Sequence, residues 1–395
     1  MFSNPLVIYN HEGNLVPIHD RLDHDSERRF LADSLDEAAR CVTLRYIPPT
    51  TDMLRVAISN GCRILHFSGH GLVDGKNNDY LVFENDHGCA HLVDAPTLLG
   101  IVQASKKHSV DLVFVASCHS HAIGQAFITA GVKYAVCVRR EARIMDETSI
   151  TFSRSFYHAL FTGHTVPEAF RIGRSRVRAS ADVPDVQREA ESDKFILLTS
   201  SATFNDASSS YEDALFARYP EGSWRDATIQ PLFFILPAPT AFFVGREPEL
   251  HYILKVLSTQ RLVTVRGPPG IGKSTLVKSV AHNVMPRETF KDGVLYVSLR
   301  GCRTAVAVMG ALRLAVLQHG LHVEAKTKDI EQKVISQLRG RHVLVVLDNA
   351  EDPLQAQPRE FRSLIRSILD SSRNSKLLVA SRQALGNGGG LLDCA

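Results

Sequence analysis

The stretch that decides the fold of the C-terminal half is Gly267-Pro268-Pro269-Gly270-Ile271-Gly272-Lys273-Ser274. It matches the phosphate-binding-loop pattern of Gly, four residues and Gly-Lys-Ser without a mismatch. Glycine is needed there because backbone N–H groups must turn inward to phosphate oxygens, and Cβ atoms would block that approach. The context favours such a loop over a chance glycine-rich turn, since an apolar strand (261–266) precedes it and helical spacing follows from Thr275. We expect Lys273 to reach the β- and γ-phosphates and the Ser274 hydroxyl to ligate Mg²⁺.

A second apolar strand supports this interpretation. Residues 343–347 are five consecutive apolar residues, and Asp348 follows them. A run of this kind is typical of a strand that is buried on both faces of a parallel sheet. Its terminal carboxylate then lies at the C-terminal edge of the sheet, where α/β folds bind ligands. The sequence therefore predicts Asp348 as a second Mg²⁺-holding residue.

Length and composition set broad limits on the rest of the chain. The 395 residues favour two domains, and 44% hydrophobic with 22% charged residues is ordinary for a globular protein. A net charge of +3 gives no argument for nucleic-acid binding. No apolar run approaches the roughly 20 residues that cross a bilayer, and we expect no membrane partner. Seven cysteines without paired spacing indicate reduced thiols in the cytoplasm.

The N-terminal half shows alternating strand and helix signals. A helix is expected over about 25–39, and apolar strands over 42–47, 63–68, 110–116 and 134–138, with further helices between and after them. This alternation predicts a parallel sheet with helices on its faces. We therefore predict an α/β protein with two doubly wound domains. Their expected limits are residues 1–205 and 241–395, joined by a partly ordered linker over 206–240.

A histidine and a cysteine follow two of these strands. His70 comes directly after the strand at 63–68, and Cys118 after the strand at 110–116. Residues at the C-terminal edges of neighbouring strands meet in space, and a histidine is the usual base that activates a cysteine thiol. Glycines on both sides of His70 leave room for a developing oxyanion. The pattern is consistent with a Cys–His dyad for acyl transfer, although a buried structural cysteine beside a chance histidine is the alternative.

A metal site at the same strand ends is less well supported. Three further histidines lie near the dyad and add possible ligands, but no pair has the spacing of a zinc site. The candidate ligands are His66, His70, Cys118, His119 and His121.

The segments around the dyad resemble a CHAT domain, the caspase-like fold related to separase and metacaspases. The resemblance rests on residues 64–71, 113–120 and 131–174 in that order and covers roughly 5–205. It implies His70 as general base or orienter, Cys118 as nucleophile, and the Gly71 amide in an oxyanion hole. A metacaspase has an Asp two residues before the nucleophile, where this chain has Ala116. A separase-like acidic S1 pocket would rest on Asp146, for which a helix N-cap is the alternative role.

The C-terminal half resembles the STAND class of signalling NTPases, including NB-ARC proteins. The segment at 242–247 is similar to the class's entry segment, in which Val244, Gly245 and Arg246 would touch the adenine. Residues 347–352 and 377–382 resemble its Walker B and sensor segments, so Arg382 could contact a γ-phosphate or could be a solvated strand-end charge. The resemblance implies ATP or ADP with Mg²⁺ as ligands. The nucleotide would lie against the loop residues Gly267, Pro268, Pro269, Gly270, Ile271, Gly272, Lys273, Ser274 and Thr275, with Asp348.

One residue predicts a switch rather than a motor. Asn349 stands where many fast ATPases place a catalytic Glu, which predicts slow hydrolysis.

The class continues with a helical lid and a winged helix after the point where this resemblance stops, so we expect a truncated NTPase half.

Two hypotheses follow from different function classes. The first is a cytoplasmic signalling protein in which an ATP/ADP switch controls a caspase-like cysteine peptidase and drives homo-oligomerisation when ATP is bound. The second is a catalytically silent caspase-like fold in a nucleotide-dependent scaffold. A transport or nucleic-acid-processing ATPase lacks support, because the sequence shows neither a membrane segment nor a basic patch.

Overall fold

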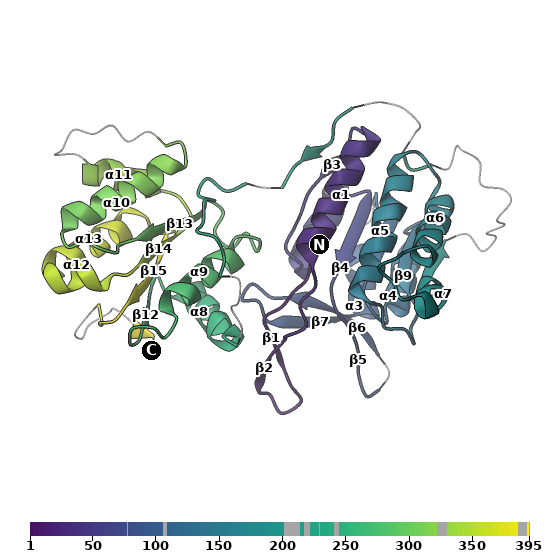
Figure 1. The fold of residues 1–395 in the computed structure, drawn as a ribbon, viewed down its shortest axis with the longest axis horizontal. Helices are drawn as coiled ribbons and strands as arrows, with labels where there is room; N and C mark the ends of the chain where they lie inside the picture. The colour runs from purple at the N-terminus through teal and green to yellow at the C-terminus, as the bar shows by residue number, and fades with distance from the viewer. Residues whose placement is uncertain are drawn as a thin grey trace. The chain divides into compact units, whose positions relative to one another are not determined.

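The chain forms two units in a computed structural model (Figure 1). The structure describes residues 1–76, 78–105, 109–200, 214–216, 222–228, 230–240, 245–321, 330–385 and 393–394. The first unit comprises Met1–Ile8, Ile18–Asn85 and Ala90–Thr228, and the second comprises Tyr9–Pro17, Asp86–Cys89 and Ile229–Ala395.

The main sheet of the first unit has the strand order β10-β9-β8-β4. Strands β4 (Ile64–Ser68), β8 (Leu112–Ala116) and β9 (Tyr134–Val138) are parallel, and β10 (Phe195–Thr199) is antiparallel to β9. Every side chain of β8 is buried, as predicted for a strand that helices cover on both sides. Leu112 and Phe114 belong to one core cluster, and Val113 and Val115 belong to another.

Helices cover both faces of this sheet. One core cluster includes residues from α1 (His24–Ala38), α5 (Asp146–Phe161) and α6 (Val166–Arg178). The other includes residues from α2 (Thr51–Ser59), α3 (Ala95–Ala104) and α4 (His121–Thr129). A short 3₁₀ turn (Asp185–Gln187) and α7 (Arg188–Asp193) precede β10. The unit is thus doubly wound, as the sequence predicts.

Short strands outside the main sheet depart from the predicted pattern. Strands β5 (Gly71–Val73), β6 (Asp79–Glu84) and β7 (Ala90–Asp94) form an antiparallel sheet, and β1 (Val7–Tyr9) pairs with β2 (Leu15–Pro17). The strand predicted over 42–47 is only β3 (Thr43–Leu44), which pairs with β11 (Arg225–Asp226). Its apolar residues predict a strand, but its pairing partner lies about 180 positions later in the sequence, beyond the reach of local patterns.

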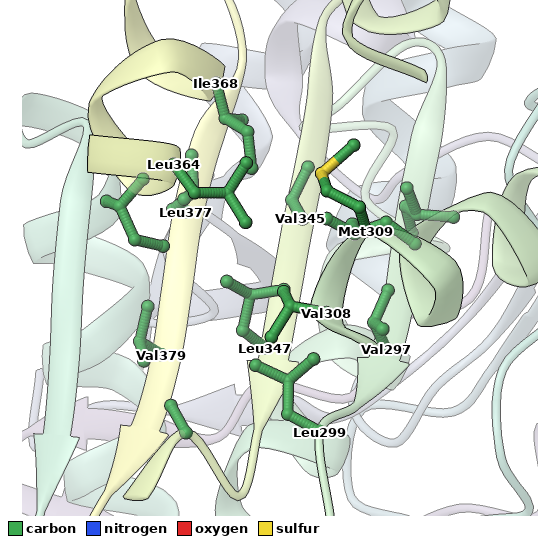
Figure 2. Close-up of a cluster of buried hydrophobic side chains, with 14 of the residues drawn as sticks. Val297, Leu299, Val308, Met309, Val345, Leu347, Leu364, Ile368, Leu377 and Val379 are labelled. Atoms are coloured by element: carbon green, nitrogen blue, oxygen red, sulfur yellow. The ribbon is translucent and has the colours of Figure 1, made fainter. Parts of the chain in front are cut away.

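The second unit contains a parallel five-stranded sheet in the order β13-β14-β15-β12-β16. Helices lie on both sides, and Figure 2 shows the core between one face and α10 and α13. Val345 and Leu347 of β14 and Leu377 and Val379 of β15 contribute to that core. The strands are β12 (Leu262–Arg266), β13 (Gly293–Ser298), β14 (Val343–Asp348), β15 (Lys376–Ser381) and β16 (Asp393–Cys394). The helices are α8 (Glu247–Thr259), α9 (Lys273–Val284), α10 (Ala305–Gln318), α11 (Ile330–Leu338), α12 (Glu351–Ala356) and α13 (Pro358–Ser371).

The predicted α/β class with two doubly wound domains is confirmed by these two sheets. No helix in the described part of the chain is long and apolar enough to cross a membrane. The predicted domain limits stay a prediction.

The described residues between the two domains are anchored in one unit or the other. Trp224 donates from Nε1 to Asp36 Oδ1 of α1 at 2.6 Å, next to the β11–β3 pair. Phe233 forms a parallel bridge with Gly293 at the start of β13, and its side chain is fully buried in the core of the second unit. Residues 222–240 are called the connector below, and their described part is therefore fixed at both ends.

Candidate active site and nucleotide-binding site

The register of the parallel sheet brings His70 and Cys118 to the same edge. Ser68 at the end of β4 pairs with Ala116 at the end of β8, so both candidate residues lie two positions beyond paired residues. The Gly69 amide continues the contact by donating to the Ala116 carbonyl at 3.2 Å. The two strand ends stay side by side as they enter the loops, as the sequence predicts for strands of one parallel sheet.

Gly71 fits against the backbone of Cys118. A Cβ at position 71 would lie 1.9 Å from the Cys118 carbonyl oxygen and 2.7 Å from Ser117 Oγ. Only glycine allows this approach without movement of the backbone. The close contact places the residue after His70 directly on the residue expected to be the nucleophile. The oxyanion role of the Gly71 amide stays a prediction.

The Cys118 thiol lies in a turn that is held from the next strand. Ile144 donates from its amide to Cys118 Sγ at 3.3 Å. Ser120 donates to the Ser117 carbonyl at 2.8 Å and accepts from the Val138 amide at 2.9 Å. His119 has a φ of 54°, an uncommon conformation for a residue other than glycine. Cys118 itself is half-buried, so the residue is held in place by these contacts and is still partly accessible to solvent.

His70 has a hydrogen-bond partner that the sequence does not reveal. Its Nε2 lies 2.7 Å from the carbonyl oxygen of Asp20. A carbonyl only accepts, so Nε2 carries the proton of the neutral ring and Nδ1 keeps the lone pair. The contacts of His70 and Cys118 include no hydrogen bond between their side chains. No sequence signal could have found Asp20, because a backbone carbonyl has no side-chain signature.

Asp146 is the first residue of α5, and the alternative role as its N-cap is wrong. The N-cap is Met145, and the carboxylate of Asp146 instead accepts from the Asp23 amide at 3.1 Å. Burial raises the pKa of the Asp146 carboxyl, and the nearby carboxylates of Glu27 and Asp23 raise it further. Asp146 thus holds the segment that also supplies the carbonyl to His70. Its role in an S1 pocket stays a prediction.

The phosphate-binding loop lies between β12 and α9, as predicted. Gly270 and Gly272 have φ values of 81° and 95°, which side chains other than glycine rarely adopt. Lys273 Nζ donates to the carbonyls of Gly267 and Pro268 at 2.9 and 3.0 Å. The lysine thus contacts its own loop and lies beside the space that the loop amides would offer to phosphates.

Asp348 joins this loop at the sheet edge. Ser274 Oγ donates to its Oδ1 at 2.8 Å, and Tyr296 on β13 donates its hydroxyl proton to Oδ2 at 2.7 Å. A hydroxyl beside a carboxylate is an oxygen donor set that suits Mg²⁺, so Ser274 and Asp348 fit the predicted metal. Burial and the Asp348 charge raise the pKa of Tyr296. Sequence reasoning missed Tyr296, since an aromatic residue inside a strand is more often core.

Two arginines near the loop have partners in the structure. Arg246 donates from Nη2 to the Ile271 carbonyl at 3.4 Å and pairs with Glu249 at 2.9 Å. Arg382, after β15, pairs through Nε with Glu351 at 3.0 Å and is 55% exposed. The γ-phosphate contact and the alternative of a solvated strand-end charge both stay predictions. Val244 lies outside the described residues, and the adenine contact of Gly245 and Arg246 stays a prediction.

The weaker expectation of a metal cluster in the first unit has no support. No group of three histidine, cysteine, aspartate or glutamate side chains within the described ranges is arranged to hold a metal ion.

Comparison with known proteins agrees with this division of the chain. Residues 22–209 match the CHAT domain, and residues 261–390 match the NACHT domain. The chain thus matches the two domain models in the order CHAT and then NACHT. The suspected recognition of a CHAT domain fused to a P-loop NTPase is confirmed, with NACHT rather than NB-ARC as the matched class. The P-loop NTPase domain implies nucleotide binding.

Related proteins share parts of this arrangement. The uncharacterized protein Rv0894 of Mycobacterium tuberculosis is 34% identical over 152 residues, which cover 38% of this chain and 35% of that protein. The regulatory protein AfsR of Streptomyces coelicolor is 36% identical over 149 residues, 33% of this chain and 14% of AfsR. The chain thus spans about a third or less of these relatives. Among solved structures, a Walker-type ATPase of Pyrococcus abyssi is 17% identical with a TM-score of 0.28, over 38% of this chain and 49% of the ATPase.

Proposed function

We propose that the protein is a nucleotide-controlled cysteine endopeptidase of signalling type, in which the NACHT domain regulates a Cys118–His70 dyad of the CHAT domain. The observation that carries the proposal is the arrangement of three groups at one sheet edge. Cys118 and His70 extend from paired strand ends, and the Asp20 carbonyl holds His70 in one tautomer. A nucleophile, a base and a group that orients the base are the parts that acyl transfer requires.

The chemistry follows from the atoms that these groups present. The Cys118 thiol gives its proton to Nδ1 of His70, and the thiolate forms a bond to the carbonyl carbon of a peptide. The C–N bond then breaks, and the imidazolium returns the proton to the leaving amine. Water hydrolyses the resulting thioester and regenerates the thiol. The charge on the peptide oxygen would be met by the Gly71 and Cys118 amides. Because the two side chains share no hydrogen bond here, we expect them to come together on substrate binding.

Control by nucleotide is supported by the connector. His282 on α9, the helix that begins at Lys273, contacts the Pro237 carbonyl through Nε2 at 2.8 Å. Phe233 is buried against β13 and α10, and Trp224 is bound to α1. The connector thus contacts α9 through Pro237 and α1 through Trp224, by one hydrogen bond each, and a change at the phosphate loop could pass along it. The name of the AfsR relative, a regulatory protein, favours a signalling role.

The nucleotide site would take ATP or ADP with Mg²⁺. Ser274 and Asp348 would hold the ion, which would shield phosphate charge when bound. Lys273 and the loop amides would hold the phosphates. Asn349, with a φ of 60°, follows Asp348 in place of an acidic base. We propose slow hydrolysis, homo-oligomerisation in the ATP state, and a cytoplasmic location in keeping with the reduced thiols.

The peptidase proposal is tested by the reactivity of Cys118. Iodoacetamide labelling followed by peptide mass spectrometry compares it with the exposed Cys41 and the half-buried Cys62 and Cys302. We expect Cys118 to react at least tenfold faster than Cys41 near pH 7, and His70→Ala to remove that advantage. Equal rates for Cys118 and Cys41 in the unmodified protein would contradict the proposal.

A silent caspase-like scaffold is the second candidate function. It is favoured by the missing hydrogen bond between His70 and Cys118 in the structure. The two candidates differ in the reactivity of Cys118. In a scaffold, Cys118 of the unmodified protein shows no enhanced reactivity, and the Cys118→Ala variant still assembles in response to nucleotide.

A further inference from the structure

The segment before and at the start of α1 is tied to the candidate active site at three places. The Asp20 carbonyl accepts from His70, the Asp23 amide donates to Asp146, and the Glu27 carboxylate contacts His66. His70 and Asp146 are candidate site residues, and His66 lies on the strand that ends before His70. The segment is therefore more than a connection between β2 and α1.

Glu27 is a buried charge whose neighbours lie on the strand leading to the dyad. It is 3% exposed, and its Oε1 lies 3.1 Å from His66 Nε2. His66 Nδ1 is in turn 3.0 Å from the Tyr157 hydroxyl of α5. Burial alone raises the pKa of Glu27, but the neighbouring His66 and His24 side chains outweigh it and hold the pKa below its usual value. The carboxylate is thus ionised near neutral pH, and its contact on β4 is His66.

A short stretch of chain joins His66 to the candidate base. His66 lies on β4, which ends at Ser68, and His70 follows His66 by four positions, after a bend at Gly69. Glu27 therefore contacts the strand whose end carries the loop with His70.

A buried carboxylate beside a histidine is weak evidence for stability. The loss of hydration of both groups offsets most of their attraction, and apolar residues of similar size often do as well. Aromatic rings surround this pair, since His66 stacks on Phe114 and lies near Phe2. The directional contacts of a carboxylate instead fix the position of one element against another. Here they fix the start of α1 against β4.

We propose that Glu27 is a positioning residue of the active site. Through His66 it holds the first turn of α1 on β4, and this keeps the Asp20 carbonyl, seven residues earlier, on Nε2 of His70. Without Glu27 the His70 ring loses its fixed tautomer and orientation, and Cys118 loses its base. The inference rests on the proposed dyad.

The test compares two glutamates of the same helix. Glu27→Gln removes the charge of the proposed positioning residue. Glu37→Gln is the matched control, because Glu37 lies on α1 and also contacts a histidine, His158 at 3.2 Å, but is 58% exposed. The readout is the rate of Cys118 alkylation as a function of pH, with circular dichroism to show that both variants fold.

We expect Glu27→Gln to slow Cys118 alkylation at pH 7 by roughly tenfold. Loss of a group that orients a functional side chain typically reduces activity by about 10- to 100-fold, and tenfold is the lower limit of that range. Its profile should move toward that of an ordinary thiol near pH 8.5. Glu27→Asp should recover part of the rate, and Glu37→Gln should match the unmodified protein. A residue with a purely structural role would change the melting temperature without moving the pH profile.

The outcomes separate this inference from the proposed function. If Cys118 of the unmodified protein reacts no faster than Cys41, the dyad fails and the inference falls with it. If Cys118 is activated and a folded Glu27→Gln variant has the same profile, the dyad stands and the inference is wrong. If Glu27→Gln does not fold, His66→Phe removes the β4 contact of Glu27 instead and keeps an aromatic ring beside Phe114. An unchanged profile in that variant also overturns the inference.

Discussion

Gly71 is the residue at which a single methyl group should matter most. A Cβ on this residue would clash with the Cys118 carbonyl oxygen and with Ser117 Oγ. The carbonyl is part of the backbone, and the serine side chain is short, so neither can rotate far out of the way. The neighbouring chain therefore has to shift if the residue grows. The position of Cys118 relative to His70 depends on this contact.

We expect Gly71→Ala to destabilise the protein by about 1–3 kcal/mol, the range for overpacking, and to reduce the reactivity of Cys118. Gly75→Ala is the control, because a Cβ there would have nothing within 4 Å. Urea denaturation and thiol alkylation measure the two effects. Equal stability and reactivity of the two variants would show that the contact is not present in solution.

His24 predicts a pH dependence of stability. Its Nε2 is buried without a hydrogen-bond partner, and burial lowers the pKa of the ring to about 4 from its ordinary 6.5. The unfolded chain binds a proton below pH 6.5, whereas the folded protein does not until near pH 4. Stability attributable to this residue is therefore full above pH 6.5 and is lost as the pH falls toward 4.

Between pH 7 and pH 5 this effect should amount to about 2 kcal/mol, at 1.36 kcal/mol per pKa unit. His24→Phe keeps a ring beside Phe2, whose centroid is 5.1 Å away, and cannot titrate. We expect the stability of the variant to fall less over this interval than that of the unmodified protein, as measured by urea denaturation at each pH. Parallel curves would indicate that His24 is hydrated in solution.

Among the elements, the connector carries the link between the two domains. Its Phe233 reaches the start of β13, where a Cβ on Gly293 would lie 2.0 Å from the Phe233 carbonyl. Gly293 also has a φ of 96°. Loss of this docking should free the connector without touching either candidate site.

We expect Gly293→Ala to weaken the dependence of Cys118 reactivity on nucleotide while leaving nucleotide affinity within about twofold, because the phosphate loop is unchanged. Gly301→Ala is a matched control, since Gly301 has a similar φ of 80° but nothing within 4 Å of a Cβ. Nucleotide titration and alkylation with ADP and ATP give the two readouts. If both variants respond to nucleotide like the unmodified protein, the connector does not transmit the signal.

The sequence predicts the elements that local patterns define. The loop at 267–274, the strands with His70, Cys118 and Asp348 at their ends, and most helices follow from periodicity, glycine placement and strand-end chemistry. The β11–β3 pair and the Phe233 bridge do not, because their partners are distant in the chain. Asp20, Glu27 and Tyr296 could not be predicted for a related reason. The roles of a backbone carbonyl, of a carboxylate on a helix and of an aromatic residue in a strand depend on tertiary contacts.

At the scale of the whole chain, two α/β units are combined, and each has a candidate site at the C-terminal edge of its sheet. The CHAT unit presents a thiol, an imidazole and a carbonyl, and the NACHT unit presents a phosphate loop with Ser274 and Asp348. A chain that joins a thiol site to a nucleotide site through an anchored connector can link the reactivity of the first to the occupancy of the second.

The most direct test of this account is the rate of Cys118 alkylation in the same protein without nucleotide, with ADP and Mg²⁺, and with ATP and Mg²⁺. Lys273→Ala, which weakens phosphate binding, is the control. We predict that the rate differs between the ADP and ATP states by at least several-fold and that Lys273→Ala abolishes the difference. Identical rates in all three conditions, with nucleotide binding verified by titration, would contradict the claim that the NACHT domain controls the CHAT site.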